Sequence, residues 1–180
     1  MMKYKIDRKR TAELNQPELQ VLAGRGDKDH FHCVLISSKA RPACPYCGSA
    51  NIRNQGTVHR EYLDLIKRND DVEPITVSLE FRKSKCMREG CGTVYYPEFS
   101  FASPYARTTR RLDDVIVRMV LAGSLSYTEI AYALNGKFSR QSVGNIYKRR
   151  IRELNADSSE NAAWYRDLKD DGRFWLKRAL

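Results

Sequence analysis

Hydrophobic and polar residues alternate in several segments of the first hundred residues, which is the pattern of half-buried strands. The alternation is clearest over 75–82, where every second residue is apolar. Three more segments are rich in β-branched and aromatic residues or alternate in part, and each predicts a strand. They are 31–37, 57–65 and 93–96. Together these segments predict a small antiparallel sheet.

Beyond Pro104 the apolar residues recur every three or four positions, as they do along one side of a helix. This first helix is expected to end at Gly123. A serine-x-x-glutamate capping box begins a second helix at Ser126. Ser139 caps a third, longer helix that runs to about Leu154. A short helix, a glycine-containing turn and a longer basic helix, in this order, are typical of a helix-turn-helix.

Four of the five cysteines form two close pairs, Cys44 with Cys47 and Cys86 with Cys91, and glycine follows each pair directly. Two thiolates at this spacing can hold one side of a zinc ion, and a second pair completes the tetrahedron. The arrangement predicts a zinc ribbon with one structural Zn2+. Four thiolates fill the coordination shell, so no open position remains for catalysis.

Two disulfides or four reduced core thiols are the alternatives to a metal. Disulfide frameworks belong to short secreted chains with a signal peptide. Here the N-terminus is charged, and no stretch approaches the ~20 apolar residues that span a bilayer. We therefore expect a cytoplasmic protein with reduced cysteines and no membrane partner, which favours the metal. Cys33 is expected to be a buried thiol, although it or a histidine (His30, His32 or His59) could replace one ligand.

The predicted fold class is α+β, with a small antiparallel zinc-ribbon sheet followed by a three-helix helix-turn-helix domain. Four parts are expected along the chain. A polar segment comes first, then the zinc-ribbon domain, then the helix-turn-helix domain, and last a tail or the remnant of a following domain. Their predicted bounds are 1–30, 31–103, 104–155 and 156–180.

The chain carries 32 basic and 22 acidic side chains, a formal net charge of +10. Residues 44–100 are balanced, with 8 basic and 8 acidic side chains, whereas 101–153 carry 10 basic and 4 acidic ones. Such an excess favours a polyanionic partner. Its position predicts that the helices, rather than the zinc region, bind this partner. The alternative is a basic surface that only keeps the protein soluble.

The third predicted helix has two different sides when its residues are placed 100° apart. One side is apolar and can pack on the preceding helices: Val143, Ile146, Tyr147, Ile151 and Leu154. The other side carries amides near the N-terminus and cations farther along: Gln141, Asn145, Lys148, Arg149 and Arg152. Amide side chains and arginine can read base edges in the major groove, and the later cations suit phosphates. Arg150 departs from this pattern because it falls on the apolar side.

Three arginines at the entrance to the first helix could reach phosphates as an arm, and Arg140 begins the third helix. The expected partner is double-stranded DNA. The predicted DNA-binding residues are Arg107, Arg110, Arg111, Arg140, Gln141, Asn145, Lys148, Arg149 and Arg152.

Several motifs follow one another in a specific order: Cys44-Pro-Tyr-Cys47-Gly48-Ser49, Phe81-Arg82-Lys83-Ser84-Lys85-Cys86, Cys91, Pro97-Glu98-Phe99, Ala106-Arg107-Thr108 and Arg111-Leu112. In this order they resemble the N-terminal zinc-binding and helix-turn-helix region of ISL-three (insertion sequence L three) family transposases. The resemblance spans about residues 31–154. It implies recognition of the inverted repeats at the ends of a mobile element. In that family a separate domain with three acidic residues cuts and joins DNA.

The 180 residues have room for neither that catalytic domain nor its spaced carboxylates, so we expect no enzymatic activity. The predicted function is that of a zinc-stabilised, sequence-specific DNA-binding protein resembling the end-recognition part of a bacterial transposase. A second copy of the chain or a full-length transposase would be its protein partner. A helix-turn-helix transcriptional regulator and a zinc-ribbon protein-interaction module are the alternatives.

Overall fold

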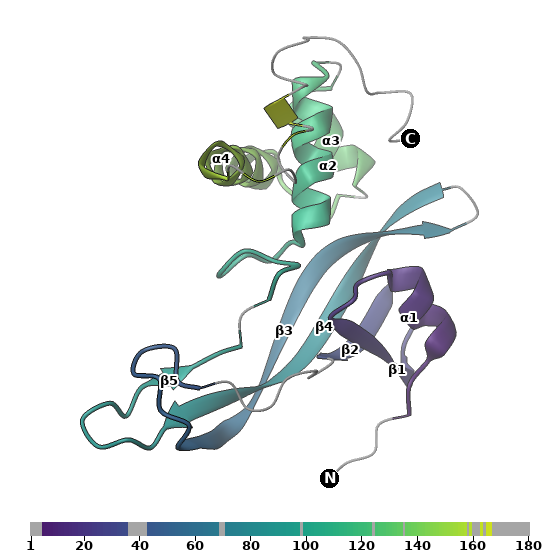
Figure 1. Ribbon diagram of the computed structural model, residues 1–180. Helices are drawn as coiled ribbons and strands as arrows, with labels where there is room; N and C mark the ends of the chain where they lie inside the picture. The colour runs from purple at the N-terminus through teal and green to yellow at the C-terminus, as the bar shows by residue number, and fades with distance from the viewer. Residues whose placement is uncertain are drawn as a thin grey trace.

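The computed structural model describes residues 5–35, 43–68, 71–97, 99–123, 125–134 and 136–157, together with positions 159, 163, 165 and 166. The end of the predicted strand 31–37, Glu98 and most of 156–180 lie outside these residues. A long two-stranded hairpin runs through the molecule, with an N-terminal helix and two strands on one side and three helices on the other (Figure 1). In chain order the elements are α1 (Arg8–Leu14), β1 (Leu19–Gly26), β2 (His30–Leu35), β3 (Ile52–Arg68), β4 (Asp71–Cys86), β5 (Val94–Tyr95), α2 (Arg110–Leu121), α3 (Tyr127–Ala133) and α4 (Arg140–Ala156).

The sheet is mixed and has five strands, in the order β1-β2-β4-β3, with β5 also beside β4. β2 runs parallel to β4, and the other neighbouring pairs are antiparallel. The predicted small antiparallel ribbon followed by a three-helix helix-turn-helix was therefore wrong, because the sheet is larger and mixed and a fourth helix, α1, precedes it. The parallel pairing joins segments far apart in the chain, which local alternation does not reveal. β1 was not predicted because its three buried residues, Leu19, Val21 and Leu22, do not alternate strictly and glycines follow them.

One face of the β3–β4 hairpin lies in the main core, the hydrophobic cluster that it forms with α1, β1 and β2. The pairing runs from Ile52 opposite Cys86 to Arg68 opposite Asp71. The alternation predicted over 75–82 is confirmed, because its four apolar side chains are at most 4 % exposed. They pack with side chains of α1, β1 and β2 in one hydrophobic cluster. Full burial of each such side chain is worth about 1.5–3 kcal/mol.

The opposite face of β3 belongs to a second core. Leu63 and Leu65 pack there with residues of α2, α3 and α4, so a single strand forms the wall between two cores. The backbone strengthens this contact, because the Leu63 N–H donates to the Arg107 carbonyl at 2.8 Å and the Leu63 carbonyl accepts from the Thr109 N–H at 3.0 Å. The three-helix unit, which comprises α2, α3 and α4, is thus fixed to the hairpin through its entry segment, residues 107–109.

Side-chain caps begin each helix of this unit. Thr109 accepts a hydrogen bond from the backbone of α2, and the caps predicted at Ser126 and Ser139 are confirmed. Gly144 of α4 faces Tyr127 of α3 so closely that an added Cβ would lie 3.1 Å from the ring. The missing side chain therefore allows α3 and α4 to approach each other. Within the described part of the chain, none of the helices has the length and apolar character needed to cross a membrane.

Candidate metal centre and basic helix face

The four paired cysteines converge at the end of the hairpin farthest from the three-helix unit (Figure 1). All four sulfur atoms lie within 4.8 Å of one another. The Cys44 and Cys91 sulfurs are 3.9 Å apart, and those of Cys47 and Cys86 are 3.6 Å apart. A tetrahedron with metal–sulfur bonds of about 2.3 Å has edges of about 3.8 Å. The sulfurs are therefore spaced to hold one metal ion, and they are too far apart for disulfide bonds of about 2.05 Å.

The two knuckles are shaped by backbone hydrogen bonds and by glycine. The Gly48 N–H donates to the Cys44 carbonyl, and the Cys86 N–H donates to that of Thr93. Gly48 and Gly92 have φ of 70° and 60°, in the left-handed region that glycine adopts without strain. The glycine after each cysteine pair, noted in the sequence, therefore serves the bend around the sulfurs.

The surroundings of Cys91 and Cys86 shift the pKa values of these two thiols in opposite directions. Thr93 contacts the Cys91 sulfur at 3.4 Å, and this side-chain interaction lowers the pKa of Cys91 to about 6. The Arg88 backbone N–H favours the thiolate of Cys86, but burial and hydrogen bonds with the other thiols outweigh it and raise the pKa of Cys86 to about 11. A divalent ion would supply the positive charge that such closely spaced thiolates require.

The hydrophobic cluster at this end is small. Apart from cysteines, its buried members within the described residues are Ile52 and Tyr95. Few apolar side chains are thus available to offset the conformational entropy of ordering both knuckles, so an ion held by the four sulfurs would contribute to the folding free energy.

Cys33 and the histidines lie outside the four-sulfur group. Cys33 is completely buried in the main core, where burial, with a further contribution from Asp64, raises its pKa to about 12. Among the described residues the ligand set contains cysteine alone, so the alternative ligands considered from the sequence are not brought to it.

The predicted DNA-binding residues of α4 separate into two groups in the structure. Five are exposed on the side of the helix away from the second core: Arg140, Gln141, Asn145, Lys148 and Arg152. Arg149 lies elsewhere, because its guanidinium turns inward to the fully buried carboxylate of Asp113 at 2.6 Å. It also donates to Thr108 at 2.9 Å. Arg149 therefore holds α4 against α2 and the entry segment.

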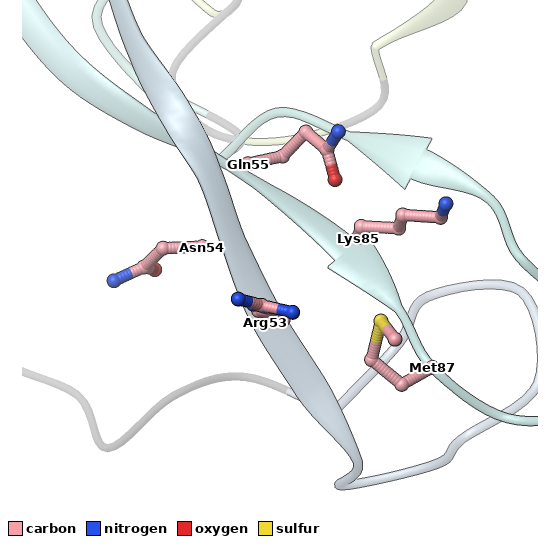
Figure 2. A pocket seen from close by; sticks show the side chains of 5 residues that line it. All are labelled: Arg53, Asn54, Gln55, Lys85 and Met87. Atoms are coloured by element: carbon pink, nitrogen blue, oxygen red, sulfur yellow. The ribbon is translucent and has the colours of Figure 1, made fainter.

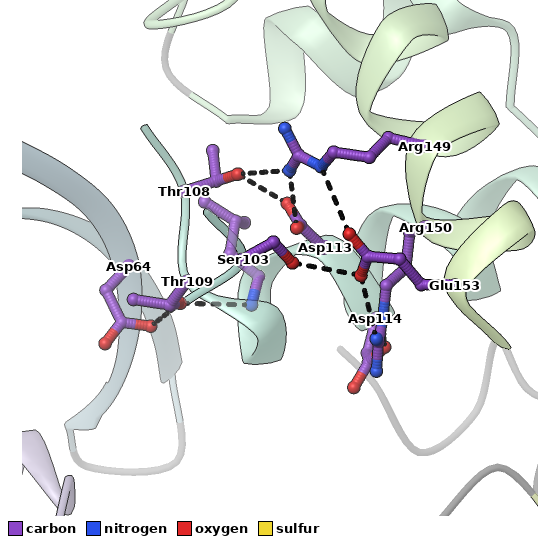
Figure 3. A network of polar contacts seen from close by, with 10 residues as sticks. Asp64, Ser103, Thr108, Thr109, Asp113, Asp114, Arg149, Arg150 and Glu153 are labelled. Atoms are coloured by element: carbon purple, nitrogen blue, oxygen red, sulfur yellow. Dashed lines mark hydrogen bonds and ion pairs between the residues drawn. The ribbon is translucent and has the colours of Figure 1, made fainter. Parts of the chain in front are cut away.

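Arg150, which interrupts the apolar side of α4, is also paired. Its Nε donates to Asp114 at 2.6 Å and its Nη1 to Glu153 at 3.1 Å. Glu153 in turn accepts from the Ser103 hydroxyl at 3.0 Å. These contacts join α4 to α2 and to the segment before it, as Figure 3 shows.

The arginines at the entrance to α2 also differ from one another. Arg107 is exposed and Arg110 is half-buried. Arg111 instead forms an ion pair at 2.7 Å with Asp64, a carboxylate of β3 with no exposed surface. Thr109 donates to the same carboxylate at 2.5 Å while it caps α2. Of the predicted arm, only Arg107 is fully open to a partner.

Two adjacent threonines thus link the hairpin to the helices. Thr109 binds Asp64, and Thr108 donates to Asp113 at 2.5 Å (Figure 3). Sequence reasoning missed this joint. Its one local signal is the pair of threonines shortly before Asp113 and Asp114, and the partner on β3 lies too far along the chain for any local pattern to indicate it.

Comparisons of this chain with protein-family models, with curated proteins and with solved structures found no match.

Proposed function

We propose that this protein binds double-stranded DNA sequence-specifically through the exposed side of α4. The sorting of charge on that helix carries the proposal. Inward-facing Arg149 and Arg150 are neutralised by carboxylates. Outward-facing Arg140 and Lys148 have no carboxylate partner within the described residues. A basic surface of this kind suits a polyanion.

The chemistry of the exposed side matches what a base-reading helix requires. Gln141 and Asn145 are four residues apart, so their amides lie on one face of the N-terminal half of α4. Gln and Asn side chains can form two hydrogen bonds with adenine. Lys148 and Arg152 follow along the same side and suit phosphates, which supply affinity rather than sequence information.

We further propose that the metal is zinc. Four cysteine thiolates at tetrahedral spacing are the ligand set of structural zinc sites, and soft sulfur ligands disfavour magnesium or calcium. A fully occupied shell offers no position for a substrate. The ion would hold Cys44, Cys47, Cys86 and Cys91 together and keep the end of the hairpin folded.

The decisive experiment is selection of bound sequences from a random duplex pool with the zinc-loaded chain. We expect a defined motif to be enriched, and we expect Asn145→Ala or Gln141→Ala to change the preferred base at one or two positions. Each lost base contact should reduce discrimination by about 1–3 kcal/mol. Lys148→Gln should weaken all sequences alike. Lys9→Gln, an exposed cation of α1, is the control and should have no effect.

Failure to enrich any motif, together with affinity that does not fall as salt rises, would refute DNA binding. The resemblance to ISL-three transposases favours the inverted repeats of a mobile element as the target class. A selected motif that matches such repeats would support this assignment. A motif found instead in promoter regions would support a transcriptional regulator.

A further inference from the structure

We propose that the cysteine end of the β3–β4 hairpin is a second DNA-binding surface, which contacts the backbone of the same duplex about one helical turn from α4. This inference rests on the proposed function of α4. The balanced charge of residues 44–100 favoured the helices alone as the DNA-binding surface. The inference adds the cysteine end of the hairpin to that surface.

The balance of charge in the hairpin hides a separation between its two ends. Near the cysteines, residues 43–60 and the β4 residues opposite and beyond them, 79–97, carry six basic side chains and two acidic ones. Farther along, residues 61–68 and 71–78 carry two basic and four acidic side chains. Four thiolates around a divalent ion add two negative charges, which still leaves the cysteine end positive.

Not all of these cations are free to bind a partner. Arg60 lies over the rings of Phe81 and Tyr96, and Arg88 donates to the Cys47 carbonyl at 3.2 Å. The remaining four are Arg53, Arg82, Lys83 and Lys85. They lie on the parts of β3 and β4 nearest the cysteines.

Arg53 and Lys85 are directly opposite each other on the two strands. Like charges in that position destabilise a sheet, so the pairing is unfavourable without an anion between or beside them. A bulge between Asn54 and Thr57 lies next to this pair, with Gly56 at a φ of 108°. Such bulges increase strand twist and redirect side chains.

The same pair lines an open hollow of about 410 Å³, with Asn54, Gln55 and Met87 as its other walls. In Figure 2, Gln55, Lys85 and Met87 lie on one side of β3 and Asn54 on the other. Cations and amides around a shallow hollow provide hydrogen-bond donors for phosphate and sugar oxygens. They do not provide the apolar enclosure that a small-molecule pocket requires.

The length of β3 sets the distance between the cysteine end and the segment that leads into the three-helix unit. Arg53 is ten residues from Leu63, the point at which the entry segment of the three-helix unit joins β3. Ten strand residues span about 33 Å, and one turn of DNA spans about 34–36 Å. In Figure 1 the cysteine end and α4 both extend to the side of the hairpin away from α1. One duplex along that side would meet both surfaces.

The test uses the double variant Arg53→Gln/Lys85→Gln in the full, zinc-loaded chain. Its affinity is measured over a salt series on two duplexes that share the selected motif, one of about 12 base pairs and one of about 24. On the long duplex, the slope of log affinity against log salt should decrease by about 1.8, since each phosphate contact contributes about 0.9. Between 50 and 200 mM salt, wild type should therefore lose about tenfold more affinity than the variant. On the short duplex the two proteins should bind alike.

Arg8→Gln/Lys9→Gln, which removes two exposed cations of α1, is the matched control and should behave as wild type on both duplexes. Hydroxyl-radical footprinting gives a second measurement. Wild type should protect two patches about ten base pairs apart, and the Arg53/Lys85 variant should lose only the distal one.

The outcomes separate the two proposals. An unchanged salt slope and footprint in the Arg53/Lys85 variant, with binding weakened in Lys148→Gln, would overturn the second surface and leave the function of α4 intact. An equal loss on the short duplex would overturn the one-turn spacing. Absence of any DNA binding by wild type would overturn both.

Discussion

The Arg149 guanidinium donates to the Asp113 carboxylate at 2.6 Å, and the carboxylate has no exposed surface. Thr108 donates to the other carboxylate oxygen at 2.5 Å, so one buried anion binds both the entry segment and α4. The next residue along the helix, Lys148, is exposed. Two neighbouring cations of α4 thus have opposite roles, one inside the protein and one at its surface.

Arg149→Met should destabilise the protein by about 3 kcal/mol, because it leaves the Asp113 charge buried without its partner. Lys148→Met should change stability by less than about 0.5 kcal/mol. Urea unfolding followed by circular dichroism measures both. At temperatures where both variants are folded, we expect Lys148→Met to lose more DNA affinity than Arg149→Met. The reverse order would mean that Arg149 leaves Asp113 to contact DNA.

The pair also predicts a pH dependence. Burial raises the pKa of Asp113 above its usual value and outweighs the opposing contacts of Thr108 and Arg149. The folded state therefore binds the proton more tightly than the unfolded chain, so the stability linked to this group is fully present below about pH 4 and is lost as pH rises through the folded pKa.

Asp113→Asn should remove this dependence. The free energy of unfolding of wild type, measured relative to Asp113→Asn between pH 3 and 7, should fall as pH rises. All other titrating groups are common to both proteins and cancel. A relative gain of wild type above pH 4 would show instead that the Arg149 charge outweighs burial.

Removal of the metal should unfold the cysteine end and leave the main core folded. Cys86→Ser should lose bound zinc, measured by metal analysis, and should lose amide-exchange protection in 43–56 and 82–96. Protection of Val77 and Leu79 should remain, because they belong to a separate core. An apo protein with full protection near the cysteines would contradict a structural ion.

Cys33→Ala is the matched control, since Cys33 lies in the main core and outside the ligand set. It should keep one zinc per chain. The raised pKa of Cys33, about 12, also predicts that this thiol resists alkylation in the folded wild-type protein at neutral pH. Rapid labelling of Cys33 would show that the main core opens readily.

Thr109 should be sensitive to loss of its hydroxyl, which both caps α2 and donates to Asp64. Thr109→Val keeps the shape but removes both interactions, and we expect a cost of about 2 kcal/mol. Thr109→Ser keeps both hydrogen bonds and should cost less. Thermal unfolding of the two variants measures the difference. Equal losses would assign the effect to the methyl group rather than to the joint.

Local patterns accounted for much of the secondary structure. The alternation over 75–82 depends only on neighbouring residues of one strand, and the caps at Ser126 and Ser139 depend only on residues in the first turn of each helix. The sequence alone was therefore sufficient to place them. The cysteine spacing likewise indicated a shared metal site, because a tetrahedral ion limits how far apart paired ligands can lie in the chain.

Long-range pairing decided the remainder. The parallel contact of His30 with Thr76 made the sheet mixed, and no residue near either one signals the other. Asp64 and Asp113 turned Arg111 and Arg149 from predicted DNA contacts into internal ion pairs, because buried carboxylates need cations that the fold brings close.

The sequence by itself determined the four-cysteine ligand set, the capped helices and the amide and basic residues on one side of α4. Each follows from spacing along the chain, which chemistry and helical geometry constrain directly. Only the tertiary structure decided which cations remain at the surface and where charge gathers. The formal charges of residues 44–100 sum to zero in the sequence. The antiparallel hairpin nevertheless brings Arg53 opposite Lys85 at one end and places most of its carboxylates toward the other.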